Sequence, residues 1–285
     1  MKKSAPAVVL AAVVLATAAA CSTSGSDTDT AASPDGGSAA EMEHIHGIAV
    51  DPEAGAVYAG THYGLFRIED GTATRVADRV QDFMGFTVAG PEHFLASGHP
   101  GEGQDGPSSL GLIESTDAGE TWHELSLSGE ADFHSLEYRH GRVYGLNSMT
   151  GQLLVSTDMQ SWQELSREPI ADFAVSPADP NVLVATTENG LTESSDGGRS
   201  FEVVGSAPLM VFVSWAEDGT LAGVTPDGVV YTAADATGGW TERGSLDGQP
   251  EALAIQSARD MYAAANGAVL VSTDGGRTFS PTLEQ

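Results

Sequence analysis

A short element returns along the chain at regular spacing, and this repeat restricts the possible folds more than any other feature of the sequence. Full copies read Ser-Thr-Asp-Ala-Gly-Glu-Thr-Trp from Ser115, Ser-Ser-Asp-Gly-Gly-Arg-Ser-Phe from Ser194 and Ser-Thr-Asp-Gly-Gly-Arg-Thr-Phe from Ser272, and a shortened copy begins at Ser156. The aspartates of the four copies are separated by 41, 38 and 78 residues. They are Asp117, Asp158, Asp196 and Asp274. A period near 40 residues is typical of a β-propeller, in which each repeat is a blade of four short strands.

The remaining units are found by the same spacing. The midpoint of the longest gap falls at Asp235, inside a degraded copy of the element, and Asp70-Gly71 closes one more unit upstream. The sequence therefore predicts an all-β protein with one propeller domain over residues 41–285, most simply of six four-stranded blades. In the first unit we expect strands at 45–50, 57–60, 64–67 and 74–77.

The repeated element also resembles a known family. The pattern Ser-x-Asp-x-Gly-x-Thr/Ser-Trp/Phe is similar to the Asp-box, or BNR repeat, of the sialidase superfamily, and sortilin-type domains and photosystem assembly factors carry similar repeats. The resemblance covers almost all of residues 41–285 and implies a propeller whose Asp-boxes form the turns between the third and fourth strands. Because the aspartate of such a turn accepts backbone N–H groups and glycine supplies a positive φ, we interpret the four motif aspartates as structural.

The N-terminal region differs in composition from the rest. Lys2 and Lys3 precede an Ala/Val/Leu run that is too short for a comfortable membrane span, and the run ends in three alanines before Cys21. This pattern resembles a bacterial lipobox, although the usual leucine three residues before the cysteine is an alanine here. We expect residues 1–21 to be a lipoprotein signal with Cys21 as the lipidation site, the alternative being an ordinary secretory signal. Residues 22–40 are Ser, Thr, Asp, Gly, Ala and Pro, and we expect a flexible tether.

Charge and cysteine content exclude several classes of function. The formal net charge is −28, and a surface this acidic repels nucleic acid and anionic lipid headgroups. We therefore expect no nucleic-acid partner, contact with the membrane only through the N-terminal lipid, and a lipid-anchored location on the outer side of a bacterial cell membrane. Cys21 is the only cysteine, so a thiolate metal site is excluded.

The histidines are distributed unevenly over the predicted blades. In a four-stranded blade, the start of the first strand and the loop between the second and third strands lie on one face, opposite the Asp-boxes. Five of the eight histidines and two methionines map to that face in three consecutive units, although Met149 aligns only after a shift of one residue. The candidate ligands are His44, His46, His62, Met84, His99 and His134. Imidazole and thioether ligands suit copper, or zinc where histidine alone binds, so the pattern predicts a transition-metal site, with hydrogen-bonded imidazoles at a channel mouth as the alternative.

Aspartates accompany these histidines in the repeat. Asp82 and Asp132 align with His44, and Asp172 follows in the fourth unit. Such carboxylates orient metal-binding imidazoles through the second ring nitrogen, although each also stands just before a phenylalanine and has the alternative role of capping a turn.

Three functions remain open at the level of sequence. The first, which we favour, is a surface-anchored binding or assembly module with a copper or zinc site and no catalytic residue. The second is a scaffold without a metal that binds a protein or cell-wall partner, the partner being an unknown protein or glycan. The third is an exo-acting glycoside hydrolase, since proteins with this repeat are often classed so. The sialidase-like arginine triad is not apparent, because Arg199 and Arg277 lie inside Asp-boxes and Arg139 and Arg142 flank a turn on the opposite face.

Overall fold

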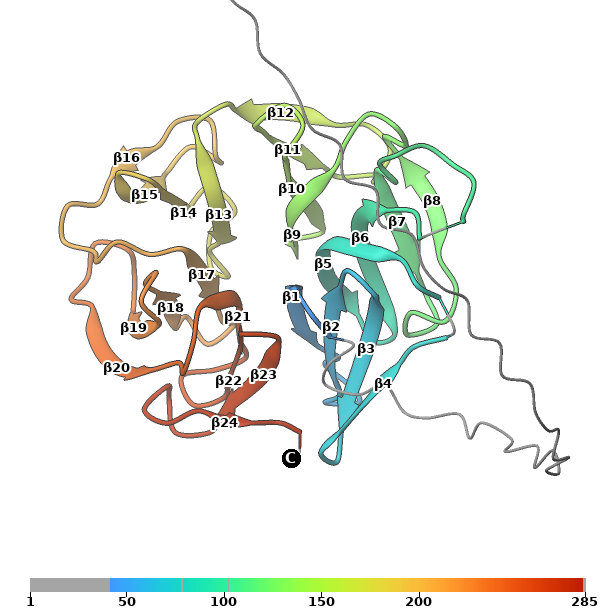
Figure 1. Cartoon of the computed structure of the whole chain (residues 1–285). Coiled ribbons are helices and arrows are strands. Elements are labelled where there is room, and N and C mark those ends of the chain that lie inside the picture. Colours follow the sequence, from blue (N-terminus) through green and yellow to red (C-terminus); the bar gives the residue numbers. More distant parts are fainter. Residues whose placement is uncertain (1–41, 78, 102, 284–285) are drawn as a thin grey trace, which may run out of the picture. The chain divides into compact units, whose positions relative to one another are not determined.

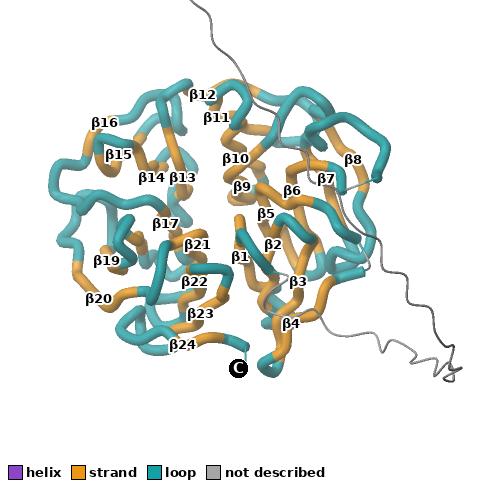
Figure 2. Tube along the Cα trace, in the orientation of Figure 1, coloured by secondary structure: helices purple, strands orange, loops and turns teal. Residues whose placement is uncertain are grey.

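The computed structural model describes residues 42–77, 79–101 and 103–283. Within these residues 24 strands form six four-stranded antiparallel sheets around a central axis, and the rest is turn and loop (Figures 1 and 2). The prediction of an all-β propeller with six blades is confirmed. The predicted signal, Cys21 and the predicted tether lie outside the described residues. In the described part of the chain no helix is long and apolar enough to span a membrane.

Each blade is built from four strands that follow one another in sequence, from the central axis outwards. The first strands are β1 (Ile45–Val50), β5 (Asp82–Gly90), β9 (Phe133–Arg139), β13 (Ile170–Val175), β17 (Phe212–Trp215) and β21 (Pro250–Ile255). The second strands are β2 (Val57–Thr61), β6 (His93–His99), β10 (Arg142–Asn147), β14 (Leu183–Thr187), β18 (Leu221–Val224) and β22 (Met261–Ala265).

The two outer strands of each blade complete the sheets. The third strands are β3 (Gly64–Glu69), β7 (Leu112–Ser115), β11 (Gln152–Ser156), β15 (Gly190–Ser194), β19 (Val229–Ala233) and β23 (Ala268–Ser272). The fourth strands are β4 (Thr72–Arg75), β8 (His123–Ser126), β12 (Gln163–Ser166), β16 (Glu202–Val203), β20 (Thr241–Ser245) and β24 (Ser280–Pro281).

The hydrophobic core is divided into layers between neighbouring blades. Both faces of a blade are covered, so a second strand such as β2 or β14 is buried along its whole length instead of alternating. Tyr58 and Phe94 pack edge to face between blades 1 and 2, with ring centroids 4.7 Å apart. Burial of the apolar side chains in these layers is the main force that holds the ring together.

Within the described residues, the ring closes without exchange of a strand between the first and last blades. Blade 1 consists of β1 to β4 and blade 6 of β21 to β24, so each is formed from one continuous segment. Side chains of blade 1, among them Met42 and Ile45, share a core layer with Ala252 and Val269 of blade 6. The Glu251 carboxylate spans the same seam, because it accepts hydrogen bonds from the Ile45 and Gly267 backbone N–H groups.

The Asp-boxes form the turns between the third and fourth strands. In blade 2 the Asp117 carboxylate accepts the Thr121 backbone N–H at 2.8 Å, while the Ser115 hydroxyl accepts the Gly119 N–H at 2.8 Å. Hydrogen bonds from the Thr121 hydroxyl and N–H hold the pKa of Asp117 at about 2. Equivalent bonds surround Asp158, Asp196 and Asp274. These aspartates thus serve as acceptors within their own turns.

Candidate metal centre

Five of the six first strands begin with a β-bulge on the face opposite the Asp-boxes, which we call the histidine face. In β1 the bulge lies between Ile45 and Gly47. A bulge adds one residue without a partner and turns its side chain away from the regular alternation. The bulged residues are His46, Met84, His134, Ala171 and Glu251. The three residues that the repeat alignment placed at one position therefore share one structural position.

The first strands surround a central channel. This cavity has a volume of about 440 Å³ and is lined by residues of all six first strands, including His46 and His134 near its mouth on the histidine face. The bulge thus brings imidazoles from blades 1 and 3 to the same opening.

Three side chains converge at this mouth from blades 1 and 2. His46 lies at the start of β1, His62 lies in the turn between β2 and β3, and Asp82 is the first residue of β5. The Nε2 atom of His46 is 3.3 Å from Nε2 of His62, and Nδ1 of His62 is 2.8 Å from Oδ1 of Asp82. One ligand atom from each of the three residues lies within 4.8 Å of the others. We refer to His46, His62 and Asp82 as site 1.

The backbone around site 1 is held in place by local bonds. The Thr61 hydroxyl donates to the Gly64 carbonyl and accepts the Tyr63 N–H, which fixes the turn that carries His62. Gly98 lies directly opposite the start of β5, where an added Cβ would come within 1.9 Å of the Asp82 carbonyl oxygen. Only glycine permits this close approach, so Gly98 sets the position of Asp82.

The geometry of site 1 fits a transition metal ion. Two nitrogen ligands with bonds of about 2.0–2.1 Å and a tetrahedral angle are about 3.3 Å apart. The Asp82 carboxylate accepts the bond from Nδ1 of His62, which leaves Nε2 of His62 as the nitrogen with a lone pair. The Nε2 atom of His46 lies 3.3 Å from this nitrogen and 3.4 Å from Nδ1 of the same ring. A carboxylate that holds the second nitrogen of a metal-binding histidine is a recurrent arrangement in metal sites.

The electrostatic environment keeps His46 uncharged. Burial, reinforced by the neighbouring His62, lowers the pKa of His46 to about 4. A neutral imidazole has a free lone pair and does not have to lose a proton to bind a metal ion near neutral pH.

His44 adjoins site 1 and, among the described contacts, forms no hydrogen bond to its members. Its ring lies edge-on to His62, with centroids 5.1 Å apart. The backbone of His44 has a φ of 58°, in the left-handed region that residues other than glycine rarely occupy. Strain of this kind is held by the surrounding structure and is enriched at functional positions.

The two remaining predicted histidines gather around another carboxylate. Nε2 of His134 lies 2.8 Å from Oδ2 of Asp132, and Nε2 of His99 lies 3.7 Å from the same oxygen. The structure therefore separates the predicted ligands instead of joining them in one site: His46 and His62, with His44 beside them, form one group, and His99 and His134 form another. Met84 occupies the bulge of blade 2, half-buried, and lies outside both hydrogen-bonded groups as far as the described contacts show.

The two aspartates that bind these imidazoles were not among the predicted ligands. Both directly precede a buried phenylalanine, a pattern that also fits a simple turn cap, so their roles were ambiguous in the sequence. The proposed alignment of Asp172 with them is wrong, because Asp172 follows the bulge of β13 and pairs with Thr186 inside the sheet. Its carboxylate accepts the Ser135 hydroxyl and the Val213 N–H within the channel.

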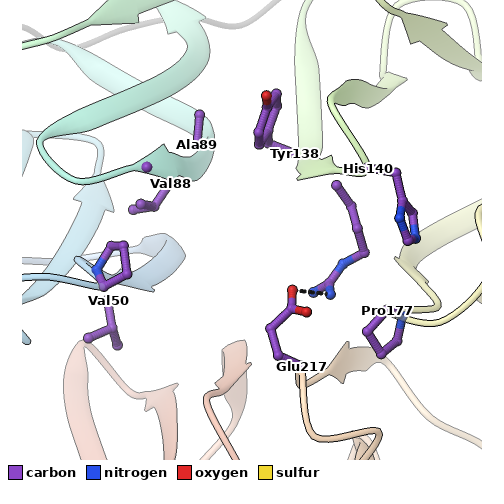
Figure 3. Close-up of a pocket in the computed structure, with 10 residues that line it drawn as sticks. Val50, Val88, Ala89, Tyr138, His140, Pro177 and Glu217 are labelled. Atoms are coloured by element: carbon purple, nitrogen blue, oxygen red, sulfur yellow. Dashed lines mark hydrogen bonds and ion pairs between the residues drawn. The ribbon is translucent and has the colours of Figure 1, made fainter.

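The opposite end of the channel has a different character. A cavity of about 370 Å³ there is lined by residues including Val50, Tyr138 and His140 (Figure 3). Arg139 crosses this end and donates to the carboxylates of Glu137 and Glu217 at 2.7 and 2.6 Å. The guanidinium is thus neutralised at this mouth, whereas the imidazoles are collected at the other.

Comparison with known proteins supports the fold. No protein-family model and no curated protein sequence matches the chain. Among solved structures, the GH74 enzyme of Niastella koreensis is similar with a TM-score of 0.61 and 15% identity over 84% of this chain. The gluconolactonase XC5397 of Xanthomonas campestris gives 0.65 and 14% over 82% of this chain and 88% of its own. YCF48 bound to a D1 peptide gives 0.51 and 18% over 85% of this chain and 82% of its own.

These similarities have a limited meaning. The chain spans 45% of the length of the GH74 enzyme. At such identities a likeness shows a shared propeller fold, which hosts proteins of unrelated function. The conclusion at this point is a six-bladed propeller with a histidine- and aspartate-lined channel mouth.

Proposed function

We propose that this protein is a lipid-anchored extracytoplasmic propeller that binds a transition metal ion, zinc or copper, at site 1 and acts as a binding or assembly module. His46 and His62 are the nitrogen ligands, and Asp82 completes the site either as an oxygen ligand or by orienting His62. The observation that carries the proposal is the 3.3 Å separation of the two Nε2 atoms with Asp82 bonded to His62.

The composition of the site agrees with a borderline metal ion. Imidazole and carboxylate ligands suit zinc and copper(II), and the two imidazoles make calcium or magnesium poor occupants, because those ions prefer oxygen ligands only. Three protein ligands leave a coordination position open, as in zinc sites that exchange ligands with solvent or a partner. Such a site suits a carrier, a sensor or a metal-dependent contact with another protein.

Anchoring at Cys21 belongs to the same proposal. A lipid on this cysteine would keep the acidic propeller near a membrane that it does not otherwise attract. Mass spectrometry of the detergent-extracted protein tests it, because diacylglycerol on the cysteine adds a mass that Cys21→Ser abolishes. An unmodified, freely secreted wild-type chain would remove this part of the proposal.

Metal binding is tested with the full-length chain purified in detergent without a polyhistidine tag. Zinc and copper(II) are titrated calorimetrically into wild type, His46→Ala, His62→Ala and Asp82→Asn. We expect each histidine variant to lose tight binding and the aspartate variant to weaken it by about 10- to 100-fold. His123→Ala is the matched control, because His123 is exposed and lies in β8, at an Asp-box. Tight binding that survives both histidine substitutions would refute site 1.

A second candidate function is the docking of a peptide or protein on the histidine face. Exposed apolar side chains lie on loops of this face: Tyr63 is 44% exposed, Val80 is 40% exposed and Met149 is 56% exposed. Exposed apolar groups with a polar surround are typical of interaction sites. The similarity to YCF48, whose structure was solved with a D1 peptide, is consistent with this use of the fold. Loss of partner capture in a Tyr63→Ser, Met149→Ser variant that still binds metal would favour docking as a separate function.

Glycoside hydrolysis is less favoured. It requires two carboxyl groups on either side of the scissile bond. At the channel mouth Asp82 and Asp132 are each bonded to an imidazole. Release of aryl alcohol from neutral aryl-glycosides would restore this alternative.

A further inference from the structure

Asp132 is the centre of a second group of side chains on the histidine face, separate from site 1. It immediately precedes β9 and its side chain is only 7% exposed. His134 lies two residues further, at the bulge of β9, and His99 is the last residue of β6 in the preceding blade. This group joins blades 2 and 3, whereas site 1 joins blades 1 and 2.

The protonation of His99 can be inferred from its neighbours. Nδ1 of His99 lies 2.6 Å from the backbone carbonyl oxygen of Ser108. A carbonyl only accepts hydrogen bonds, so this nitrogen carries the proton. In the neutral ring Nε2 then has a lone pair, and it faces Oδ2 of Asp132 across 3.7 Å.

This pair of atoms is not a hydrogen bond. A separation of 3.7 Å is too long for one, and two acceptors that face each other repel. A cation between them would convert the repulsion into two favourable contacts. A nitrogen and an oxygen that bind one zinc ion at about 2.0–2.2 Å lie roughly 3–4 Å apart.

The Asp132 carboxylate is also incompletely satisfied. Oδ2 accepts hydrogen bonds from Nε2 of His134 and from the Ser148 hydroxyl, both at 2.8 Å. Oδ1 is buried and has no hydrogen-bond partner among the described residues. A buried carboxylate oxygen without a partner is unfavourable, and a bound cation is one way to compensate it.

The long loop between β6 and β7 holds this arrangement in place. Its Ser108 carbonyl fixes the His99 ring, and the Ser109 hydroxyl contacts the Met149 sulphur at 3.6 Å. The loop is tied down by the bond from Leu110 N–H to the Gly98 carbonyl. An exposed thioether therefore stands at the rim of a group that already contains two imidazoles and a carboxylate.

We propose that His99, Asp132 and His134 form a second, weaker binding site for a divalent transition metal ion, which we call site 2. The direct ligands are Nε2 of His99 and the Asp132 carboxylate, with His134 holding Oδ2 in place and water completing the coordination. The ligand atoms of site 2 do not converge as closely as those of site 1, and the affinity is lower for that reason. Site 2 does not depend on metal binding at site 1.

The competing explanation is a protonated His99 that forms an ion pair with Asp132. The two explanations differ in stoichiometry. Zinc and copper(II) are titrated into the full-length, tag-free chain, and we expect two equivalents, the second at least about tenfold weaker than the first. His99→Ala should remove only the weaker equivalent, and His62→Ala only the tighter one. Because the side chain of His99 is 38% exposed, its replacement carries little risk to the fold.

Asp132→Asn provides a second variant that keeps the shape of the side chain. It should also abolish the weaker equivalent, while His123→Ala should leave both unchanged. One equivalent in wild type that His62→Ala abolishes would overturn site 2 and retain site 1. One equivalent that His99→Ala abolishes and His62→Ala retains would support site 2 and overturn site 1. Two equivalents that both survive His99→Ala and Asp132→Asn would overturn site 2.

Discussion

The Nε2 atoms of His46, in β1, and His62, in the turn between β2 and β3, lie 3.3 Å apart within one blade, and Asp82 reaches the second imidazole from the next blade. Burial and the nearby His62 together disfavour protonation of His46. His46 is therefore uncharged near neutral pH before any metal ion arrives, which reduces the competition between protons and metal at this ligand.

The titration of His46 tests this description. Its pKa of about 4 results from burial first and from His62 second, so His62→Ala should raise it towards 6.5. We expect the imidazole signals of His46 in the metal-free protein, followed by NMR, to titrate well below the ordinary histidine pKa of 6.5. A His46 that titrates near 6.5 would contradict the described packing.

Close packing of blades 2 and 3 gives a test of the channel wall. An added Cβ on Gly85 would lie 2.4 Å from the Phe133 carbonyl oxygen, whereas Gly205 has nothing within 4 Å. Gly85→Ala should destabilise the fold by about 1–3 kcal/mol through overpacking, and Gly205→Ala should change it by less than about 0.5 kcal/mol. Chemical denaturation measures both. Equal losses of stability in the two variants would show that β5 and β9 can move apart at little cost, and would contradict this prediction.

The two ion pairs of Arg139 are predicted to contribute unequally to the free energy of unfolding. Glu137 is 18% exposed and Glu217 is 82% exposed at the side chain. Arg139→Gln leaves the Glu137 carboxylate buried without its partner and should cost about 3 kcal/mol of unfolding free energy. Glu217→Gln should cost less than about 1 kcal/mol. If denaturant titrations showed a larger loss of unfolding free energy for Glu217→Gln than for Arg139→Gln, the exposed pair would be the more important one and this prediction would be wrong.

Asp172 predicts a pH dependence of stability. Burial raises its pKa from 3.8 to about 6, against the hydrogen bonds from Val213 and Ser135. The folded chain thus holds this proton more tightly than the unfolded chain, so the contribution to stability is complete below about pH 4 and is lost as the pH rises to about 6. Asp172→Asn removes this loss. The difference in melting temperature, variant minus wild type, should be more positive at about pH 7 than at about pH 4.5. Asp105→Asn, on an exposed loop, is the control and should show the same difference at both pH values.

The fold was predictable because the repeat encodes it directly. The spacing of Asp117, Asp158, Asp196 and Asp274 gave the number of blades, and the hydrophobic run at 45–50 coincides with β1. The fourth strand of blade 1 was expected at 74–77 but spans Thr72–Arg75. That blade lacks a full Asp-box, so its turn is shorter than the motif would make it.

The candidate site was predictable only in part. Alignment of the repeats placed His46, Met84 and His134 on one face, because a bulge at a fixed point of the blade re-aims one residue each time. The division into two groups depends on which imidazole meets which carboxylate. The pairing of imidazoles with carboxylates is decided by the turn that carries His62 and by the loop that positions His99. The repeat pattern does not predict the conformation of either segment.

The seam between blades 1 and 6 has a mechanical consequence. Each described blade consists of four strands that are consecutive in sequence, so blades 1 and 6 are held together by non-covalent contacts between their side chains and backbone, not by a common sheet. Among the described residues, the contacts that close this seam include the Glu251 hydrogen bond to Ile45 and the apolar layer that contains Met42, Ile45, Ala252 and Val269. His46 and His62 belong to blade 1 and Asp82 to blade 2, so a tilt of blade 1 at its seam with blade 6 would change the distances within site 1.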